Sequence, residues 1–236
     1  MAITRLSLSD IETELLRIVG NYPTSPDSDW KTTAALYRII NTYGQKLVMK
    51  AAQFVKSAPP GRQVRIDMYR TTTNSTTTGS GLLVSSGGSV IYLPVNCDLP
   101  LTLYDRTAGA QVPFVRNVRA YHQDLLDMLP GTPAACELLD YVTVPVESTW
   151  ARQGVLYPAT ASGVTPSLTL EFYRLPASMA TDMADATYPD CDPKYDWLFV
   201  YGPACDLLRP ENPTYERYKA METEMLKELA VTAKIV

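Results

Sequence analysis

The chain has 236 residues and a formal net charge of −4, and 19% of its residues are charged. This charge balance excludes a globally basic protein that binds nucleic acid through many phosphate contacts. The length is sufficient for one large domain or two small ones with a real core.

Cysteine usage and the start of the chain indicate the compartment. The four cysteines show no CxxC spacing, residues 1–10 lack the pattern of a signal peptide, and no apolar run reaches the length of a membrane span. We therefore expect no membrane partner and a protein of the reducing cytosol, or of a particle assembled there.

Two helices are predicted at the N-terminus. Ser9 and Glu12 form a capping box for the first, and Gly20 is suited to end it in a left-handed turn. Apolar residues three or four apart predict a long second helix over residues 30–57, which the prolines of residues 58–61 stop.

The middle of the chain changes to strand periodicity. Residues 71–81, almost wholly Thr, Ser, Asn and Gly, are predicted to form an exposed, mobile loop. A short helix is expected at residues 119–129, with one or two further helical turns at 134–141. The predicted strands lie at residues 64–69, 82–84, 90–93, 99–103, 112–115, 142–146, 154–157 and 167–175.

The last fifth of the chain returns to helical patterns. Asp192-Pro193 and Asn212-Pro213 each place a cap residue before a proline suited to a first helical turn. Gly202-Pro203, inside the first of these helices, is expected to kink or split it.

The order of elements predicts an α+β fold. We expect a helical bundle built from residues 1–61 and 188–236, which carries an inserted β-rich domain with a short helix at residues 62–187.

Catalytic, metal and cofactor signals are weak. His122, the only histidine, is more typical of a surface or interface residue than of a base. The cysteines are too dispersed for a metal site, and no nucleophile elbow or phosphate-binding loop is present. We predict no catalytic residue, no metal ligand and no cofactor.

The aromatic composition favours an interaction role. The chain has 15 tyrosines and 4 phenylalanines, and tyrosine combines a large ring with a polar hydroxyl, which suits interfaces. The candidate interface residues are Tyr195, Tyr201, Tyr215 and Tyr218 on the C-terminal helices. Six arginines against three acidic residues between 62 and 120 could face a phosphate backbone or an acidic partner, or be simply solvated.

The two ends of the chain resemble the neck adaptor, or head–tail connector, proteins of tailed bacteriophages. The resemblance lies in the capped first helix, the Tyr22-Pro23 loop, the helix over 36–54, and the C-terminal run from Tyr188-Pro189 to the helix carrying Tyr215, Glu216, Tyr218, Met221 and Leu226. The strand and turn of residues 91–98 add to it.

This resemblance implies a non-enzymatic virion protein, assembled in the host cytoplasm. It implies a homo-oligomeric ring, usually of twelve copies, between the portal protein and a tail or gatekeeper protein, with DNA passing through the channel without specific binding. The C-terminal segment would order on the portal, so the candidate portal-binding residues are Lys227, Leu229, Val231, Lys234, Ile235 and Val236.

Three alternatives stay open at this stage: another phage tail-completion or minor capsid protein, an enzyme using His122, and a bacterial protein with an unrelated α+β fold.

Overall fold

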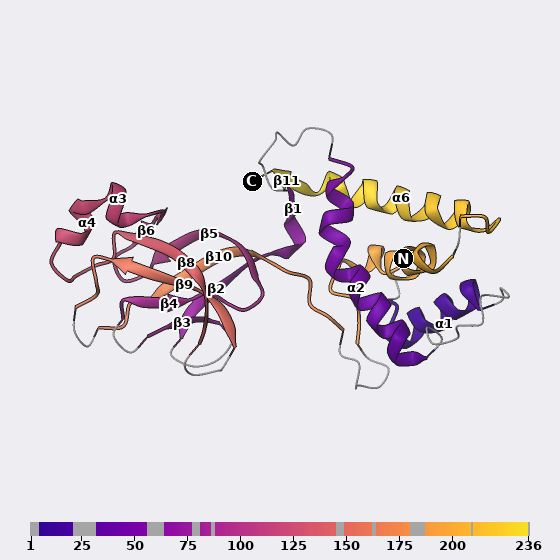
Figure 1. The fold of residues 1–236 in the computed structure, drawn as a ribbon, viewed down its shortest axis with the longest axis horizontal. Helices are drawn as coiled ribbons and strands as arrows, with labels where there is room; N and C mark the ends of the chain where they lie inside the picture. Colours follow the sequence, from indigo (N-terminus) through magenta and orange to yellow (C-terminus); the bar gives the residue numbers. More distant parts are fainter. Residues whose placement is uncertain are drawn as a thin grey trace. The chain divides into compact units, whose positions relative to one another are not determined.

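The computed structural model describes residues 5–20, 32–55, 64–76, 81–85, 88–144, 149–161, 164–179, 187–208 and 210–235. The chain divides into two compact units, Met1–Tyr69 with Pro176–Val236, and Arg70–Leu175. We call them the helical unit and the strand unit; Figure 1 shows the elements of each.

The helical unit combines four α-helices with short elements and a two-stranded sheet. β1 and β11 pair antiparallel, with Val64 opposite Ile235. The elements are α1 (Leu8–Val19), α2 (Thr33–Ala52), β1 (Val64–Ile66), the 3-10 turns η2 (Asp67–Tyr69) and η3 (Pro193–Tyr195), α5 (Leu198–Leu207), α6 (Tyr215–Val231) and β11 (Ala233–Ile235).

The first helix begins two residues earlier than predicted. Ser7 is the cap: its hydroxyl accepts the Asp10 N–H at 3.2 Å, and the Asp10 carboxylate accepts the Ser7 N–H at 2.9 Å. This reciprocal pair leaves Leu8 inside the helix on its buried face. The left-handed end predicted at Gly20 is also wrong, because Gly20 is right-handed (φ −69°) and its N–H bonds the Leu16 carbonyl.

The second helix buries the face that its periodicity predicts. Leu36, Ile40, Tyr43 and Leu47 are each at most 1% exposed, as the three- and four-residue spacing requires. Thr32 caps its start. The helix ends at Ala52, so its predicted continuation over residues 53–55 is wrong; residues 30–31 and 56–57 of the predicted helix lie outside the described part of the chain.

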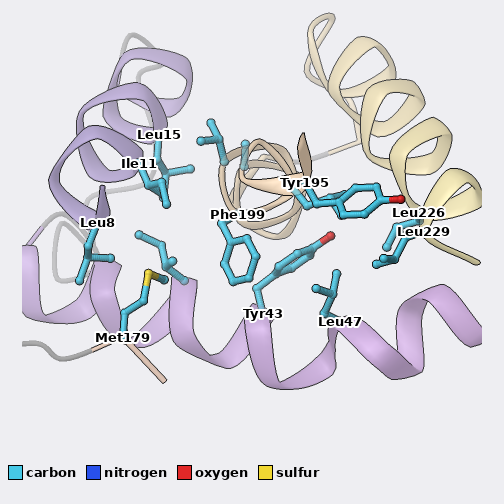
Figure 2. Packing of buried hydrophobic residues seen from close by; sticks show 14 of the residues in the cluster. Leu8, Ile11, Leu15, Tyr43, Leu47, Met179, Tyr195, Phe199, Leu226 and Leu229 are labelled. Atoms are coloured by element: carbon cyan, nitrogen blue, oxygen red, sulfur yellow. The ribbon is translucent and has the colours of Figure 1, made fainter. Parts of the chain in front are cut away.

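The four helices enclose one apolar core. Figure 2 shows Ile11 and Leu15 of α1, Tyr43 of α2 and Phe199 of α5 pointing toward one another, with Leu226 of α6 beside them. Tyr43 and Phe199 meet edge to face with ring centroids 6.1 Å apart.

α5 lies close to α2. A Cβ built on Gly202 would lie 1.9 Å from the Tyr43 ring, so only glycine allows this approach of the two helices. α5 continues through Pro203 as one helix of 10 residues, so of the predicted kink or split at Gly202-Pro203 the split is wrong. Leu198, Phe199, Val200, Ala204 and Cys205 on either side of the proline are buried.

The strand unit contains one sheet of nine strands with the order β6-β5-β10-β2-β3-β4-β9-β8-β7. Two short helices, α3 (Val118–Tyr121) and α4 (Gln123–Asp127), connect β7 to β8. The strands are β2 (Arg70–Thr76), β3 (Leu82–Val84), β4 (Val90–Tyr92), β5 (Cys97–Asp105), β6 (Ala110–Val112), β7 (Phe114–Val115), β8 (Ala135–Thr143), β9 (Trp150–Tyr157) and β10 (Leu168–Arg174).

The two edge strands of this sheet, β6 and β7, follow each other in the chain. β6 and β7 are separated only by Pro113; β6 pairs antiparallel with β5, and β7 pairs parallel with β8. The Pro113 carbonyl also accepts the Cys136 N–H at 2.9 Å. The sheet is therefore close to a closed barrel, around an apolar core that includes Leu103, Leu156 and Leu170.

The predicted fold class is therefore wrong. The chain is not a helical bundle with an inserted β domain: it is a mixed α+β protein with a large nine-stranded, near-barrel sheet and six α-helices among the described residues. The error arose from treating the strands as an excursion from the helices, whereas their pairing makes one nearly continuous sheet with a core of its own.

Two local predictions in this unit are also wrong. The Thr-rich stretch forms β2, paired with β10 on one side and β3 on the other, because β-branched threonines suit a half-buried pleated surface; residues 77–80 lie outside the described chain. The helical turns predicted at 134–141 are part of β8, where pairing with β9 overrides local helix propensity.

Candidate functional site

The residues considered for catalysis are not assembled into a catalytic group. His122 lies between α3 and α4, and its imidazole has no hydrogen bond or ion pair to another described residue. The four cysteines are free thiols, and burial raises the pKa of Cys97 and of Cys136 to about 12. Within the described ranges, no three His, Cys, Asp or Glu side chains are grouped to hold a metal ion.

The candidate interface tyrosines occupy two different environments. Tyr195 is 2% exposed and belongs to the core of the helical unit. Tyr201, Tyr215 and Tyr218 are half-buried at the margin of that core. Only these three can therefore contact a partner without rearrangement of the unit.

Two of these tyrosines form a stack with a tryptophan. The Trp197 and Tyr201 rings are 5.4 Å apart between centroids with an interplanar angle of 22°, and Tyr201 and Tyr218 are 5.9 Å apart at 26°. All three side chains are half-buried. We call Trp197, Tyr201 and Tyr218 the aromatic stack.

The helical geometry explains how the stack forms. Trp197 and Tyr201 are four residues apart at the start of α5, so their side chains lie on the same face. α5 packs against α6, and this packing brings Tyr218 onto the Tyr201 ring. Sequence reasoning selected both tyrosines by residue type but missed Trp197, although its spacing from Tyr201 was a usable signal.

Charged groups of both signs act on Tyr201. Burial raises the pKa of Tyr201, and the neighbouring Tyr218 and Glu14 raise it further. The positive charges of Arg217 and Arg17 lower it. Arg17 and Glu14 form an ion pair with an N–O distance of 2.6 Å on α1. An apolar, aromatic centre with a charged rim is the usual anatomy of a protein–protein interface.

The candidate portal-binding residues are held more firmly than expected. Lys227 is exposed and Val231 is 84% exposed, but Leu229 is fully buried in the core of the helical unit. The backbone of Lys234 and Ile235 pairs with β1, opposite Arg65 and Val64. Val236 lies outside the described residues. The segment is thus mostly ordered on its own unit.

Sequence reasoning also missed a buried carboxylate on α6. Glu222 of α6 has a side chain with no exposed surface, and it accepts hydrogen bonds from Tyr43 (2.9 Å), Lys50 (3.1 Å) and Lys219 (2.6 Å). Burial alone would raise its pKa, but the hydrogen bond from Lys219, the charge of Lys50 and the bond from Tyr43 lower it overall. Lys50 also lies 3.5 Å from Asp206 of α5, so these contacts, the Glu222 network, link three helices.

A second buried carboxylate binds the first described residues of the chain. Asp196, 1% exposed, accepts the Leu6 N–H at 2.9 Å and forms an ion pair with Arg5 at 3.2 Å. Both carboxylates accept several hydrogen bonds from donors of their own unit, as buried polar groups generally do.

Comparison with known proteins does not identify the chain: no protein-family model matches it, and neither does any curated protein. In the part of the chain that the structure describes, no helix combines the length and the apolar character needed to cross a membrane.

Proposed function

We propose that this protein is a non-enzymatic adaptor of a tailed-phage neck, in which copies assemble into a ring through the aromatic stack. The observation that carries the proposal is the stack itself: three large rings, stacked at centroid distances of 5.4 and 5.9 Å with interplanar angles of 22° and 26°, remain partly open to solvent. Such rings contribute much binding energy at a small entropic cost, because the stacking already fixes their orientation.

The ring contact follows from symmetry. Identical copies close a ring through a head-to-tail contact, in which the stack of one copy meets a different surface of the next. The exposed Arg217 near the stack gives such a contact orientation if it meets an acidic residue of the next copy, whereas Glu14 and Arg17 already pair with each other.

The partners come from the sequence resemblance to neck adaptors. We propose the portal protein and a tail or gatekeeper protein, and a channel through which DNA passes without specific binding, consistent with a formal net charge of −4 per copy. Exposed Lys227 and Val231 are the residues of the C-terminal segment that support portal contact. Leu229 would contribute only by keeping α6 in place.

The experiment is sedimentation of the purified full-length chain over a range of concentrations, alone and with portal protein. Tyr218→Ala should raise the concentration needed for assembly by about tenfold or more, since interface aromatics are often hot spots. Tyr104→Ala, a change at a 40% exposed tyrosine of the strand unit, is the control and should leave assembly unchanged.

Two results would count against the proposal. One is assembly of the Tyr218→Ala protein at the wild-type concentration. The other is a wild-type chain that stays monomeric both alone and with portal protein.

A further inference from the structure

The hairpin of β8 and β9 has an outer edge that is only partly covered. β7 pairs with β8 at Cys136 and Glu137, and this pairing does not extend along the rest of β8. β9 pairs with the other side of β8 as far as Thr143, opposite Trp150.

The hydrogen-bond pattern shows which backbone groups face this open edge. The Val144 N–H donates to the Thr149 carbonyl, and the Arg152 carbonyl accepts from Leu93 on the β4 side of β9. In an antiparallel ladder the bonded pairs alternate, so Tyr141 and Thr143 direct their N–H and C=O groups away from β9. No backbone group in the described ranges pairs with them there.

Large apolar side chains stand exposed beside these free backbone groups. Trp150 is 66% exposed, Tyr141 56% and Leu139 39%. Residues paired across a ladder share a face, so Tyr141 and Thr143 lie on the same face as Arg152 and Trp150. The opposite face of the hairpin is covered, with Val144 and Ala151 packed against Leu83.

The bulge in β8 prepares this surface. The register shifts between Leu138 and Tyr141, and the Leu139 carbonyl accepts a hydrogen bond from Arg152 Nε at 3.1 Å. Bulges commonly redirect side chains at a strand edge. We call Leu139, Tyr141, Thr143, Trp150 and Arg152 the β8 edge surface.

The size of the surface decides what kind of partner fits it. Its three exposed apolar side chains offer roughly 350 Å², taking about 150–250 Å² for a whole aromatic side chain. A stable contact between two folded proteins needs about 800 Å² from each. Two copies joined edge to edge would fall well short, whereas an extended segment gains its affinity from backbone hydrogen bonds as well as side-chain pockets.

The charge on the surface adds a requirement for the sequence of that segment. Among the described residues, Arg152 donates only its Nε, to the Leu139 carbonyl, so the terminal nitrogens of its guanidinium are able to bind a carboxylate. A segment with apolar residues at alternate positions would cover Trp150 and Tyr141, and an acidic residue on the same side would meet Arg152.

We propose that the β8 edge surface binds an extended segment of a partner protein, which adds a strand beside Tyr141 and Thr143 and carries alternating apolar residues with one acidic residue. This contact lies in the strand unit and does not depend on the aromatic stack of the helical unit.

The test uses a random twelve-residue peptide library selected against the full-length chain. We expect enriched sequences with alternating apolar residues and an acidic residue. Thr143→Pro should weaken the selected peptides about tenfold or more, because it removes an outward N–H while the β8–β9 ladder keeps its bonds. Thr143→Val, which keeps the N–H, is the matched control and should bind them as the wild type does.

Modified peptides test the same contact without changing the protein. N-methylation of the peptide amides that face β8 should abolish binding, and N-methylation of the intervening amides should not. The proposal is overturned if no sequence is enriched, if the enriched sequences lack alternation, or if methylation at either set has the same effect. Self-association of the free chain that Thr143→Pro abolishes would assign the edge to a second copy and also overturn it.

Discussion

The helical unit and the strand unit fill their interiors with different chemistry. The helical core contains the carboxylates of Asp196 and Glu222, each bound by charged and neutral donors. In the strand unit the buried carboxylate of Asp105 accepts, among the described residues, the backbone N–H groups of Thr107 and Ala108 in its adjoining turn. The other buried polar residue of the strand unit among the described residues is Thr160, and the apolar core of this unit includes Leu103, Leu156 and Leu170.

This difference shows how each unit fixes its geometry. A strand ladder sets spacing and register through the backbone, so the barrel core needs only apolar side chains of suitable volume. Helices can slide and rotate against one another, and the helical unit restricts them with specific polar contacts and a close approach at Gly202. The helical unit should therefore be more sensitive to single substitutions and to pH.

The largest expected effect comes from adding one methyl group at a helix contact. Gly202→Ala places its Cβ 1.9 Å from the Tyr43 ring, so α5 and α2 must separate, and we expect a loss of about 3 kcal/mol of unfolding free energy. Gly154→Ala in the barrel meets Ile91 at 2.8 Å and Cys136 at 2.9 Å, and should cost about 1–2 kcal/mol.

Hydrogen exchange followed by mass spectrometry measures both changes unit by unit. Gly131→Ala, whose Cβ would have its nearest neighbour at 3.8 Å, is the control and should be nearly neutral. Equal losses for Gly202→Ala and Gly154→Ala would remove the contrast between the units.

The next effect concerns the Glu222 network. Glu222→Gln removes the negative charge that binds both Lys50 and Lys219, and should lower the free energy of unfolding by about 2 kcal/mol at pH 7. The loss should be smaller than for breaking a fully buried ion pair, because both lysines reach solvent. Glu224→Gln, at an exposed position of the same helix, should have little effect. Chemical denaturation of the three proteins measures the difference.

The same variant should change the acid sensitivity of the protein. Because folding lowers the pKa of Glu222 below its ordinary value of 4.5, the unfolded state takes up the proton first as the pH falls. The stability from this group is therefore complete above that value and is lost as the pH falls through the lowered pKa. Glu222→Gln should show a flatter decline below about pH 4.5 than wild type; parallel curves would argue against the network.

Local patterns in the sequence predict much of the helical unit and less of the strand unit. The buried face of α2 and the β3–β4 pairing follow from apolar spacing and turn residues. The strand character of β2 does not, because its partner β10 comes from a distant segment. The strand β8 pairs with its hairpin partner β9, but the local pattern of residues 134–141 indicated helical turns instead. A glutamate in a helix such as Glu222 is typical of an exposed position, so its burial becomes visible only when Tyr43 and Lys50 are placed around it.

The candidate surfaces show the same limit. Residue type alone pointed to Tyr201 and Tyr218, but whether a tyrosine lies at the margin or in the core depends on how α5 and α6 pack, which is why Tyr195 proved to be buried. No pattern in the sequence singled out Trp150 as a candidate surface residue. Its exposure follows from the register of β8 and β9 beyond the covered part of the sheet.

The smallest expected effect tests whether ion pairs matter equally in the two units. Arg70 of β2 and Glu171 of β10 form an ion pair with an N–O distance of 2.6 Å, but their side chains are 42% and 29% exposed. Water and salt screen such a pair, so Glu171→Gln should cost about 0.5 kcal/mol or less and nothing measurable in 0.5 M salt. The loss for Glu222→Gln should persist in the same salt, because that carboxylate has no solvent-exposed surface. Chemical denaturation of both variants at low and high salt measures the two losses of unfolding free energy. If the loss for Glu222→Gln also disappears in high salt, the two ion pairs are screened alike and the contrast between the units is wrong.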